Sequence, residues 1–145
     1  MEAKILVIDD EENIRFTFER LLRGAGYGVE TASNLEEGLA QIGENGFDLV
    51  FADILLGGQS GIDILREIRR RDLTCPVVFI TGYPNFETAS EAVRLGAFDY
   101  LPKPVLKEAL LKVAGLAVAY KKSRDDSQRC QNICQRHLSD HCQRR

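Results

Sequence analysis

Leu49-Val50-Phe51-Ala52-Asp53 is the stretch that decides the fold, because four apolar residues run directly into a carboxylate. A short apolar run of this kind predicts a strand that is buried on both faces of a parallel sheet. Asp53 would then lie at the carboxyl end of that strand, at the sheet edge where open α/β folds bind ligands. Taken alone, an acid in this position more often caps a turn or the following helix than carries chemistry. Its companions elsewhere in the chain decide between these interpretations.

Four further apolar runs predict four more strands, at residues 5–8, 29–32, 77–80 and 98–101. Between the runs, apolar residues recur at helical spacing, which predicts helices that each turn one face toward the sheet. Five strands alternating with five helices predict a doubly wound α/β fold with a parallel sheet, because right-handed crossovers join such units. After Asp53 we expect a loop over residues 54–61, whose glycines allow backbone shapes closed to other residues.

The same spacing predicts which residues of the helices are buried. The expected inward positions in the third, fourth and last helices are Ile64, Leu65 and Ile68; Ala89, Ala92 and Val93; and Leu106, Leu110, Val113, Ala114 and Ala117.

The composition suits one compact domain, since 145 residues with 44% hydrophobic side chains can build one core but not two. Four apolar residues after the N-terminal Met1 to Lys4 are too few for a signal peptide, so we expect a soluble, cytoplasmic protein without a membrane span. The four cysteines are then expected to be reduced thiols, with Cys75 as a small core residue.

The net charge of −3 is distributed unevenly along the chain. Residues 121–145 hold seven Lys/Arg and three Asp/Glu, so they carry +4 and residues 1–120 carry −7. An acidic body argues against nucleic-acid binding, because contact with phosphates requires a positive face.

Five polar residues follow the predicted strands at their carboxyl ends: Asp9, Asp10, Asp53, Thr81 and Lys103. In a parallel sheet these ends share one edge, so the five side chains should converge. Crowded carboxylates repel one another and favour a bound cation, and hard oxygen ligands suit Mg²⁺. The hydroxyl and the ammonium could then hold phosphoryl oxygens. Each residue taken singly could instead be a helix cap, a strand end or a solvated lysine.

In these motifs the chain resembles the receiver domains of two-component response regulators over residues 3 to about 120. The resemblance rests on four segments in the order and spacing of that family. They are Ile5-Leu6-Val7-Ile8-Asp9-Asp10-Glu11, Asp53 with Ser60-Gly61, Ile80-Thr81-Gly82-Tyr83, and Gly96-Ala97-Phe98-Asp99-Tyr100-Leu101-Pro102-Lys103-Pro104. The resemblance implies a flavodoxin-like strand order 2-1-3-4-5.

The resemblance also implies roles for individual residues. Asp53 would accept a phosphoryl group from the phosphohistidine of a sensor kinase or phosphotransfer protein. Mg²⁺ would be bound by Asp10, Asp53 and the main-chain carbonyl of Leu55, with Asp9 acting largely through water. Lys103 would pair with the phosphoryl group, and the bond from Lys103 to Pro104 would be cis, an isomer that X–Pro bonds tolerate.

Thr81 and backbone N–H groups near Leu55 and Gly82 would cradle the phosphoryl group, according to the same resemblance. As Thr81 turns toward the phosphoryl group, Tyr100 would rotate inward and change the surface of the fourth helix, fifth strand and fifth helix. The alternative is that Tyr100 is a static aromatic side chain at the sheet edge.

Two positions tune the lifetime of the phosphorylated form in this family, and here they hold Leu55 and Tyr83. Neither side chain can orient an attacking water as a carboxylate or amide does, so we predict slow self-dephosphorylation. The family usually has Pro where this chain has Gly57, which predicts a more mobile loop and an altered kinase contact without loss of a ligand.

The pattern weakens after Tyr120, and we interpret residues 121–145 as an extension of the last helix, a linker or coiled-coil start, or a frayed end. Cys130, Cys134, His137 and His141 resemble metal ligands, but as a helical stripe they span too far for one tetrahedral zinc. A longer parent protein with an output domain is compatible with the sequence.

The leading hypothesis is a signalling switch that catalyses only its own phosphorylation and dephosphorylation. The first alternative is a Mg²⁺-dependent phosphatase or phosphotransferase with Asp53 as nucleophile; such enzymes typically carry a second acid two residues later, where this chain has Leu55. The second is a pseudo-receiver that acts only as an interaction module, which a complete pocket disfavours. The family resemblance also implies two kinds of partner. One is a downstream target, and the other is a second copy of the chain, bound through the fourth-helix to fifth-helix face.

Overall fold

A computed structural model describes the side chains of residues 2–71 and 73–127 and continues the backbone through residue 143. Twelve elements follow one another along this part of the chain. They are β1 (Lys4–Ile8), α1 (Glu12–Gly24), β2 (Gly28–Ala32), α2 (Leu35–Glu44), β3 (Leu49–Asp53), β4 (Leu55–Leu56), β5 (Gln59–Ser60), α3 (Ile62–Arg70), β6 (Val77–Thr81), α4 (Phe86–Arg94), β7 (Asp99–Pro102) and α5 (Lys107–Gln143).

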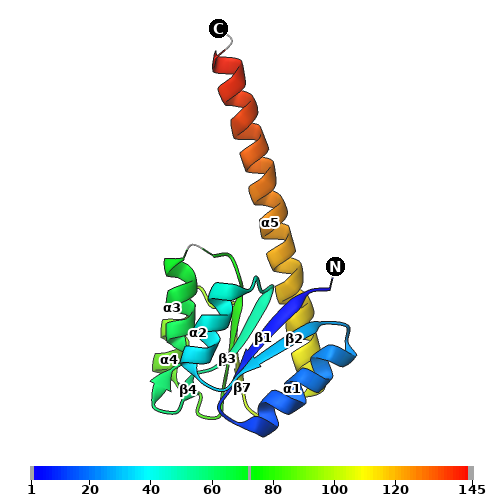
Figure 1. Ribbon diagram of the computed structural model, residues 1–145. Coiled ribbons are helices and arrows are strands. Elements are labelled where there is room, and N and C mark those ends of the chain that lie inside the picture. Colours follow the sequence, from blue (N-terminus) through cyan, green and yellow to red (C-terminus); the bar gives the residue numbers. More distant parts are fainter. Residues whose placement is uncertain (1, 72, 144–145) are drawn as a thin grey trace.

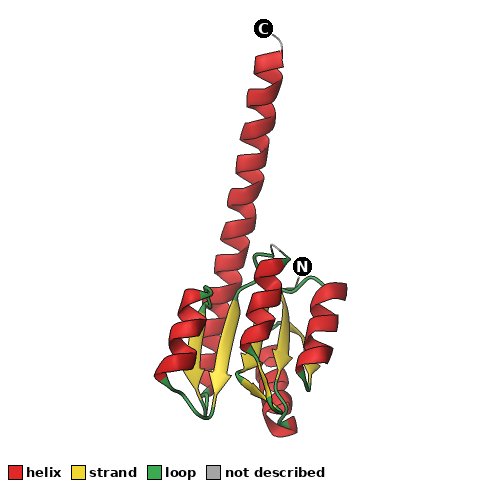
Figure 2. Ribbon diagram, turned by 90° about the vertical axis from the view of Figure 1, so that its left-hand side faces the viewer, coloured by secondary structure: helices red, strands yellow, loops and turns green. Residues whose placement is uncertain are grey.

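Five of the strands form one parallel sheet in the order β2-β1-β3-β6-β7. This confirms the predicted doubly wound fold and the order 2-1-3-4-5, since β6 and β7 are the fourth and fifth strands of this sheet. Helices α1 and α5 cover one face, and α2, α3 and α4 cover the other (Figure 1). The strand arrows point to one edge, which lies away from the free part of α5 (Figure 2).

The core has two halves because successive strand residues point to opposite faces of the sheet. In β3, Val50 and Ala52 pack toward α2 and α3, whereas Leu49 and Phe51 pack toward α1 and α5. Every residue of β3 is buried, including Asp53. The predicted strand at residues 49–53 is therefore the central one, with β1 and β6 paired on its two sides.

Most of the predicted inward residues are buried, with three exceptions. Ile64, Leu65 and Ile68 of α3 have no exposed surface, and Cys75 is buried as expected. Val93 was expected inside but is 74% exposed, and Ala89 is only partly buried. Ala92 alone is buried in α4, and the neighbouring Val93 lies about 100° around the helix axis from it, toward solvent.

Leu106 is the third exception, since it is 71% exposed. It precedes α5, and its carbonyl accepts the N–H of Leu110 at 2.9 Å, so it begins the helix rather than packing beneath it. The other four predicted residues of α5 are all buried, namely Leu110, Val113, Ala114 and Ala117.

Helix α5 continues as far as Gln143 and extends beyond the body of the domain (Figures 1 and 2). The zinc hypothesis for Cys130, Cys134, His137 and His141 concerns side chains outside the described residues. No helix in the described part of the chain is long and apolar enough to cross a membrane.

Candidate functional site

The five predicted site residues lie at the carboxyl edge of the sheet. Asp9 and Asp10 follow β1, Asp53 ends β3, Thr81 ends β6, and Lys103 follows β7. The register places Asp53 opposite Ile80, so Thr81 is one residue further along the adjacent strand. The backbone N–H of Lys103 donates to the carbonyl of Thr81 at 2.7 Å, which fixes where the lysine leaves the sheet.

Lys103 connects the acids at the centre of the site. Its Nζ lies 2.8 Å from Asp53 Oδ2, 3.0 Å from Asp9 Oδ2 and 3.3 Å from Glu11 Oε1. Burial lowers the pKa of this ammonium, but hydrogen bonds and charge attraction from Asp53 and Asp9 outweigh it and raise the pKa above its usual value. The lysine is therefore a fixed positive charge between buried carboxylates.

Asp9 is the most deeply buried of the acids, with no exposed surface. Its Oδ1 accepts the N–H of Glu11 at 2.9 Å, and its Oδ2 contacts the Lys103 ammonium at 3.0 Å. Burial is the main cause that raises the pKa of Asp9. A buried carboxylate oxygen with spare bonding capacity favours an additional cation nearby.

The carboxylates meet closely enough to share a metal ion. Asp9, Asp10, Glu11 and Asp53 each place one carboxylate oxygen so that the four atoms lie within 4.8 Å of one another. Oxygen ligands of this kind fit Mg²⁺, which binds through one or two carboxylates and keeps several waters. The donor set and the burial of Asp9 thus both fit a magnesium ion.

Thr81 lies beside the acids with almost no exposed surface. Its Oγ1 accepts the backbone N–H of Tyr83 at 3.0 Å. The same arrangement recurs at Asp53, whose Oδ1 accepts the backbone N–H of Leu55 at 3.1 Å. In both segments, the residue two positions after the site residue therefore donates its backbone N–H to the side chain of that site residue.

The segment after Asp53 corrects one expectation. We expected a loop over residues 54–61. Instead, β4 and β5 form a short β-hairpin with two residues in each strand, in which Leu55 pairs with Ser60. Gly57 and Gly58 connect the strands, both with positive φ. Gly61 approaches the backbone so closely that a Cβ atom there would lie 1.9 Å from the carbonyl oxygen of Asp53.

Tyr100 lies in β7, the strand next to the one that ends at Thr81, and it contacts α4 through its hydroxyl. The hydroxyl lies 2.9 Å from Thr88 Oγ1 and accepts the N–H of Asn85 at 3.3 Å. The side chain of Asn85 accepts the N–H of Thr88 at 2.9 Å and so caps the helix. Tyr100 is therefore bonded to the first turn of α4, and its ring is partly buried. The bond between Lys103 and Pro104 is cis.

Two residues that contact this machinery were not among the predicted site residues. Glu11 contacts Lys103, and the signal for it was present, since it directly follows the acid pair in the first motif. Thr88 contacts Tyr100, but a threonine within a helix carries no pattern that marks such a contact.

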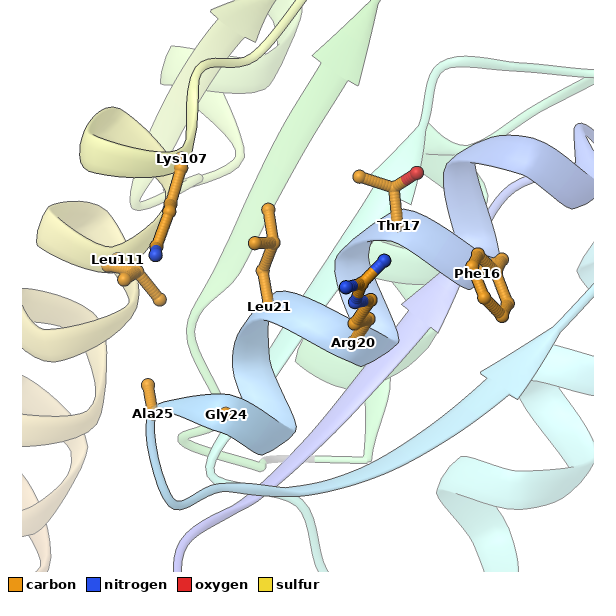
Figure 3. Close-up of a pocket in the computed structure, with 8 residues that line it drawn as sticks. All are labelled: Phe16, Thr17, Arg20, Leu21, Gly24, Ala25, Lys107 and Leu111. Atoms are coloured by element: carbon orange, nitrogen blue, oxygen red, sulfur yellow. The ribbon is translucent and has the colours of Figure 1, made fainter.

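A groove elsewhere on the molecule contains none of the predicted site residues. It lies between α1 and the start of α5, has a volume of about 440 Å³, and exposes two cations, Arg20 and Lys107, beside apolar side chains (Figure 3). The residues that line it are Phe16, Thr17, Arg20, Leu21, Gly24, Ala25, Lys107 and Leu111.

Comparison with known proteins identifies the family. The family model of the response regulator receiver domain matches residues 5–114 of the sequence, which contain all five predicted site residues. The chain is a member of this family. It is 39% identical over 121 residues to the transcriptional regulatory protein ZraR of Escherichia coli K12 and 32% identical over 139 residues to the nitrogen assimilation regulatory protein NtrX of Azorhizobium caulinodans.

These relatives are much longer than the receiver domain itself. The match covers 83% of this chain but 27% of ZraR, and 94% of this chain but 31% of NtrX. The chain thus spans less than a third of the length of these relatives.

Solved structures agree with this assignment. A receiver domain from Clostridium thermocellum superposes with a TM-score of 0.77 at 41% identity, covering 83% of this chain and 97% of that one. NtrX from Brucella abortus superposes with a TM-score of 0.81 at 38% identity, covering 88% of this chain and 29% of that one. The receiver domain is therefore a module of two-component response regulators, the class of protein that the sequence predicted.

Proposed function

We propose that this receiver domain is a switch in which Asp53 accepts a phosphoryl group from the phosphohistidine of a sensor kinase or phosphotransfer protein. The observation that carries the proposal is the position of Lys103, whose ammonium contacts the carboxylates of both Asp53 and Asp9 at 2.8 and 3.0 Å. A fixed cation beside a carboxylate nucleophile supplies the charge neutralisation that phosphoryl transfer requires.

The reaction forms one bond and breaks another. An oxygen of the Asp53 carboxylate attacks phosphorus, the bond from phosphorus to the histidine nitrogen breaks, and its electron pair stays on the imidazole. The product is an acyl phosphate on Asp53. Lys103 pairs with the transferred group, and Thr81 donates its hydroxyl to it, together with backbone N–H groups near Leu55 and Gly82.

Asp10, Asp53 and the main-chain carbonyl of Leu55 would bind Mg²⁺ directly, and Asp9 would act through a bound water. The metal would neutralise charge on the phosphoryl oxygens and on the crowded acids. The proximity of the four carboxylate oxygens supports this ligand set.

Switching follows from the contact between Tyr100 and α4. When Thr81 turns toward the phosphoryl group, the Tyr100 ring moves inward and its hydroxyl leaves Thr88 and Asn85, which changes the surface of α4, β7 and α5. That surface would bind an output domain, a downstream target or a second copy of the chain. The domain would act in the cytoplasm and would catalyse only its own phosphorylation and dephosphorylation.

Labelling with a small phosphodonor tests the proposal. Wild-type protein and Asp53→Asn are treated with acetyl phosphate, with Mg²⁺ or with EDTA, and weighed as intact chains. We expect one phosphoryl group per chain, dependent on Mg²⁺ and absent from Asp53→Asn. Catalytic consumption of the donor without a stable label would instead support the phosphatase alternative, and no reaction would support a pure interaction module.

A further inference from the structure

We infer that Arg15 is a positioning residue for the magnesium site, because its guanidinium fixes the peptide group that joins Asp9 to Asp10. The inference rests on the proposed function, in which Asp10 binds the metal directly. It goes further by assigning the orientation of that ligand to an arginine of α1 that is not among the predicted site residues. Arg15 acts on the metal through the backbone of the two acids.

The carbonyl of Asp9 lies just past the end of the ladder between β1 and β2. The N–H of Asp9 still donates to the carbonyl of Ala32, the last residue of β2, at 3.1 Å. Beyond Ala32 the chain turns into α2, whose N-cap is Asn34, so strand β2 offers no further donor to β1. Arg15 provides the missing donor, since its Nη1 donates to the carbonyl of Asp9 at 2.7 Å.

Helix geometry brings Arg15 to this carbonyl. Arg15 lies near the start of α1, where its own N–H donates to the carbonyl of the N-cap residue Glu11 at 3.2 Å. Side chains on a helix point back toward its N-terminus, so the long side chain of Arg15 reaches Asp9 ahead of the helix. The arginine is partly buried. A charged donor at this distance holds a carbonyl more firmly than a neutral donor does.

Asp10 is the acid whose position depends most on this peptide group. The carboxylates of Asp9 and Asp53 are each held twice, by a backbone N–H two residues further along the chain and by Lys103. The side chain of Asp10 is exposed and makes no hydrogen bond within the part of the chain that the structure describes. Its place beside the other acids therefore follows from its backbone.

The planar peptide group transmits the hold of Arg15 to Asp10. In a trans peptide the carbonyl oxygen and the following N–H point in opposite directions, so a fixed Asp9 carbonyl also fixes the N–H of Asp10 and the start of its side chain. Without the bond to Arg15, the peptide group is free to rotate about the single bonds on its two sides. The Asp10 carboxylate then spends less time in the cluster of oxygens that lie within 4.8 Å of one another.

The charge of Arg15 alone would have the opposite effect on the metal. Like charges repel, so a bystander cation near a metal site weakens Mg²⁺ binding, and its removal strengthens binding. Removal of a positioning residue weakens binding instead. The sign of the change in the Mg²⁺ dissociation constant therefore separates the two roles.

Titration of Mg²⁺ into the isotopically labelled full chain, followed by the NMR shifts of the Asp10 and Leu55 amides, measures this constant without phosphoryl chemistry. We expect Arg15→Met to raise it by about threefold to tenfold, at or below the roughly 10- to 100-fold effect of residues that bond directly to a ligand side chain. In EDTA, the carbonyl carbon resonance of Asp9 should also shift in this variant, because the carbonyl loses its donor.

Arg20→Met is the matched control. It removes the same charge from the same helix, but Arg20 lies in the groove of Figure 3, which contains none of the predicted site residues. The Mg²⁺ dissociation constant of Arg20→Met should stay within about twofold of wild type.

The outcomes separate this inference from the proposed function. Arg15→Met that binds Mg²⁺ as tightly as wild type, or more tightly, overturns the positioning role, and so does an unchanged Asp9 carbonyl resonance. Should Arg15→Met fail to fold, the neutral and shorter Arg15→Gln decides the question by the same two measurements. Asp10→Asn tests the metal site itself: if it leaves Mg²⁺ binding unchanged, the proposed ligand set is wrong and the inference falls with it. Weak binding in Asp10→Asn with normal binding in Arg15→Met overturns the inference alone.

Discussion

The ammonium of Lys103 lies 2.8 Å from the Asp53 carboxylate and 3.0 Å from that of Asp9, so one cation neutralises two buried acids. Removing it leaves both acids without their partner. Lys103→Met should lower the free energy of unfolding in EDTA by about 2 kcal/mol, less than the roughly 3–5 kcal/mol for a fully buried pair because part of the lysine is exposed.

Urea denaturation in EDTA and in excess Mg²⁺ measures this effect. Mg²⁺ should recover part of the loss in Lys103→Met, because the metal replaces the missing positive charge. Lys107→Met is a suitable control, since Lys107 is an exposed lysine at the start of α5 with no ion pair to these acids in the described part of the chain. Equal stability of Lys103→Met and Lys107→Met would contradict the role assigned to the ammonium.

Asp9 should make the metal-free protein less stable as the pH rises. Burial raises the pKa of Asp9 above its ordinary value of 3.8, so between the ordinary and the raised value the folded state binds more protons than the unfolded state. Stability falls with rising pH wherever the folded state binds more protons. Asp9→Asn removes this loss, so its stability advantage over wild type in EDTA should grow from acid toward neutral pH.

Unfolding curves at several pH values from about 4 to about 7 give the comparison. Excess Mg²⁺ should shrink or reverse the advantage at neutral pH, because a bound cation favours the charged carboxylate. A pH-independent difference between Asp9→Asn and wild type would show that Asp9 is not the group responsible.

Gly61 should tolerate no side chain. A Cβ atom at this position would lie 1.9 Å from the carbonyl oxygen of Asp53, and that oxygen belongs to backbone that cannot move aside easily. Gly61→Ala should lower the free energy of unfolding by about 2–3 kcal/mol. It should also slow labelling of Asp53 by a phosphodonor. Gly46→Ala, where a Cβ atom meets nothing within 4 Å, should change neither quantity.

The sequence predicted the position of the site because chain order alone determines it. Asp9 directly follows a strand, Asp53 and Thr81 each end one, and parallel strands deliver their carboxyl ends to one edge regardless of how the helices pack. Lys103 was likewise predicted from its position directly after the fifth strand. Its simultaneous contact with Asp53 and Asp9 depends on the reach of one side chain, which no spacing in the sequence encodes.

The errors arose where local pattern does not decide between two arrangements. In α4, both Ala92 and Val93 fit an apolar face, and only packing against the sheet selected Ala92. The hairpin at residues 55–60 did carry a signal, since Gly-Gly between two short segments is typical of type I′ turns. Its flanking strands have only two residues each, too short for an alternating pattern to mark them.

Thr88 should hold Tyr100 in its present position. The two hydroxyls lie 2.9 Å apart, so Thr88→Val removes one partner with little change in shape. We expect a loss of stability of about 1 kcal/mol and altered NMR shifts of the Tyr100 ring. Thr88→Ser, which keeps the hydroxyl, should resemble wild type. If the ring shifts of Thr88→Val match those of wild type, the hydroxyl contact does not hold the tyrosine.

Phosphorylated Asp53 should hydrolyse slowly, because the two side chains at the rim of the site are poor at orienting water. The backbone N–H groups of Leu55 and Tyr83 bond to Asp53 and Thr81, so both side chains are held next to the reacting groups. They are 52% and 75% exposed, where an attacking water would approach. Neither offers a carboxylate or an amide, the groups that position such a water.

The lifetime of the acyl phosphate, followed by intact mass after removal of the donor, should therefore be minutes or longer at neutral pH with Mg²⁺. Leu55→Asn adds an amide at the rim and should shorten this lifetime by about tenfold, a small part of what positioned polar groups contribute in enzymes. Leu55→Met keeps the size and the apolar character and should leave the lifetime unchanged. A wild-type lifetime of seconds would mean that some other group orients the water, and equal lifetimes of the two variants would exclude residue 55 as a control point.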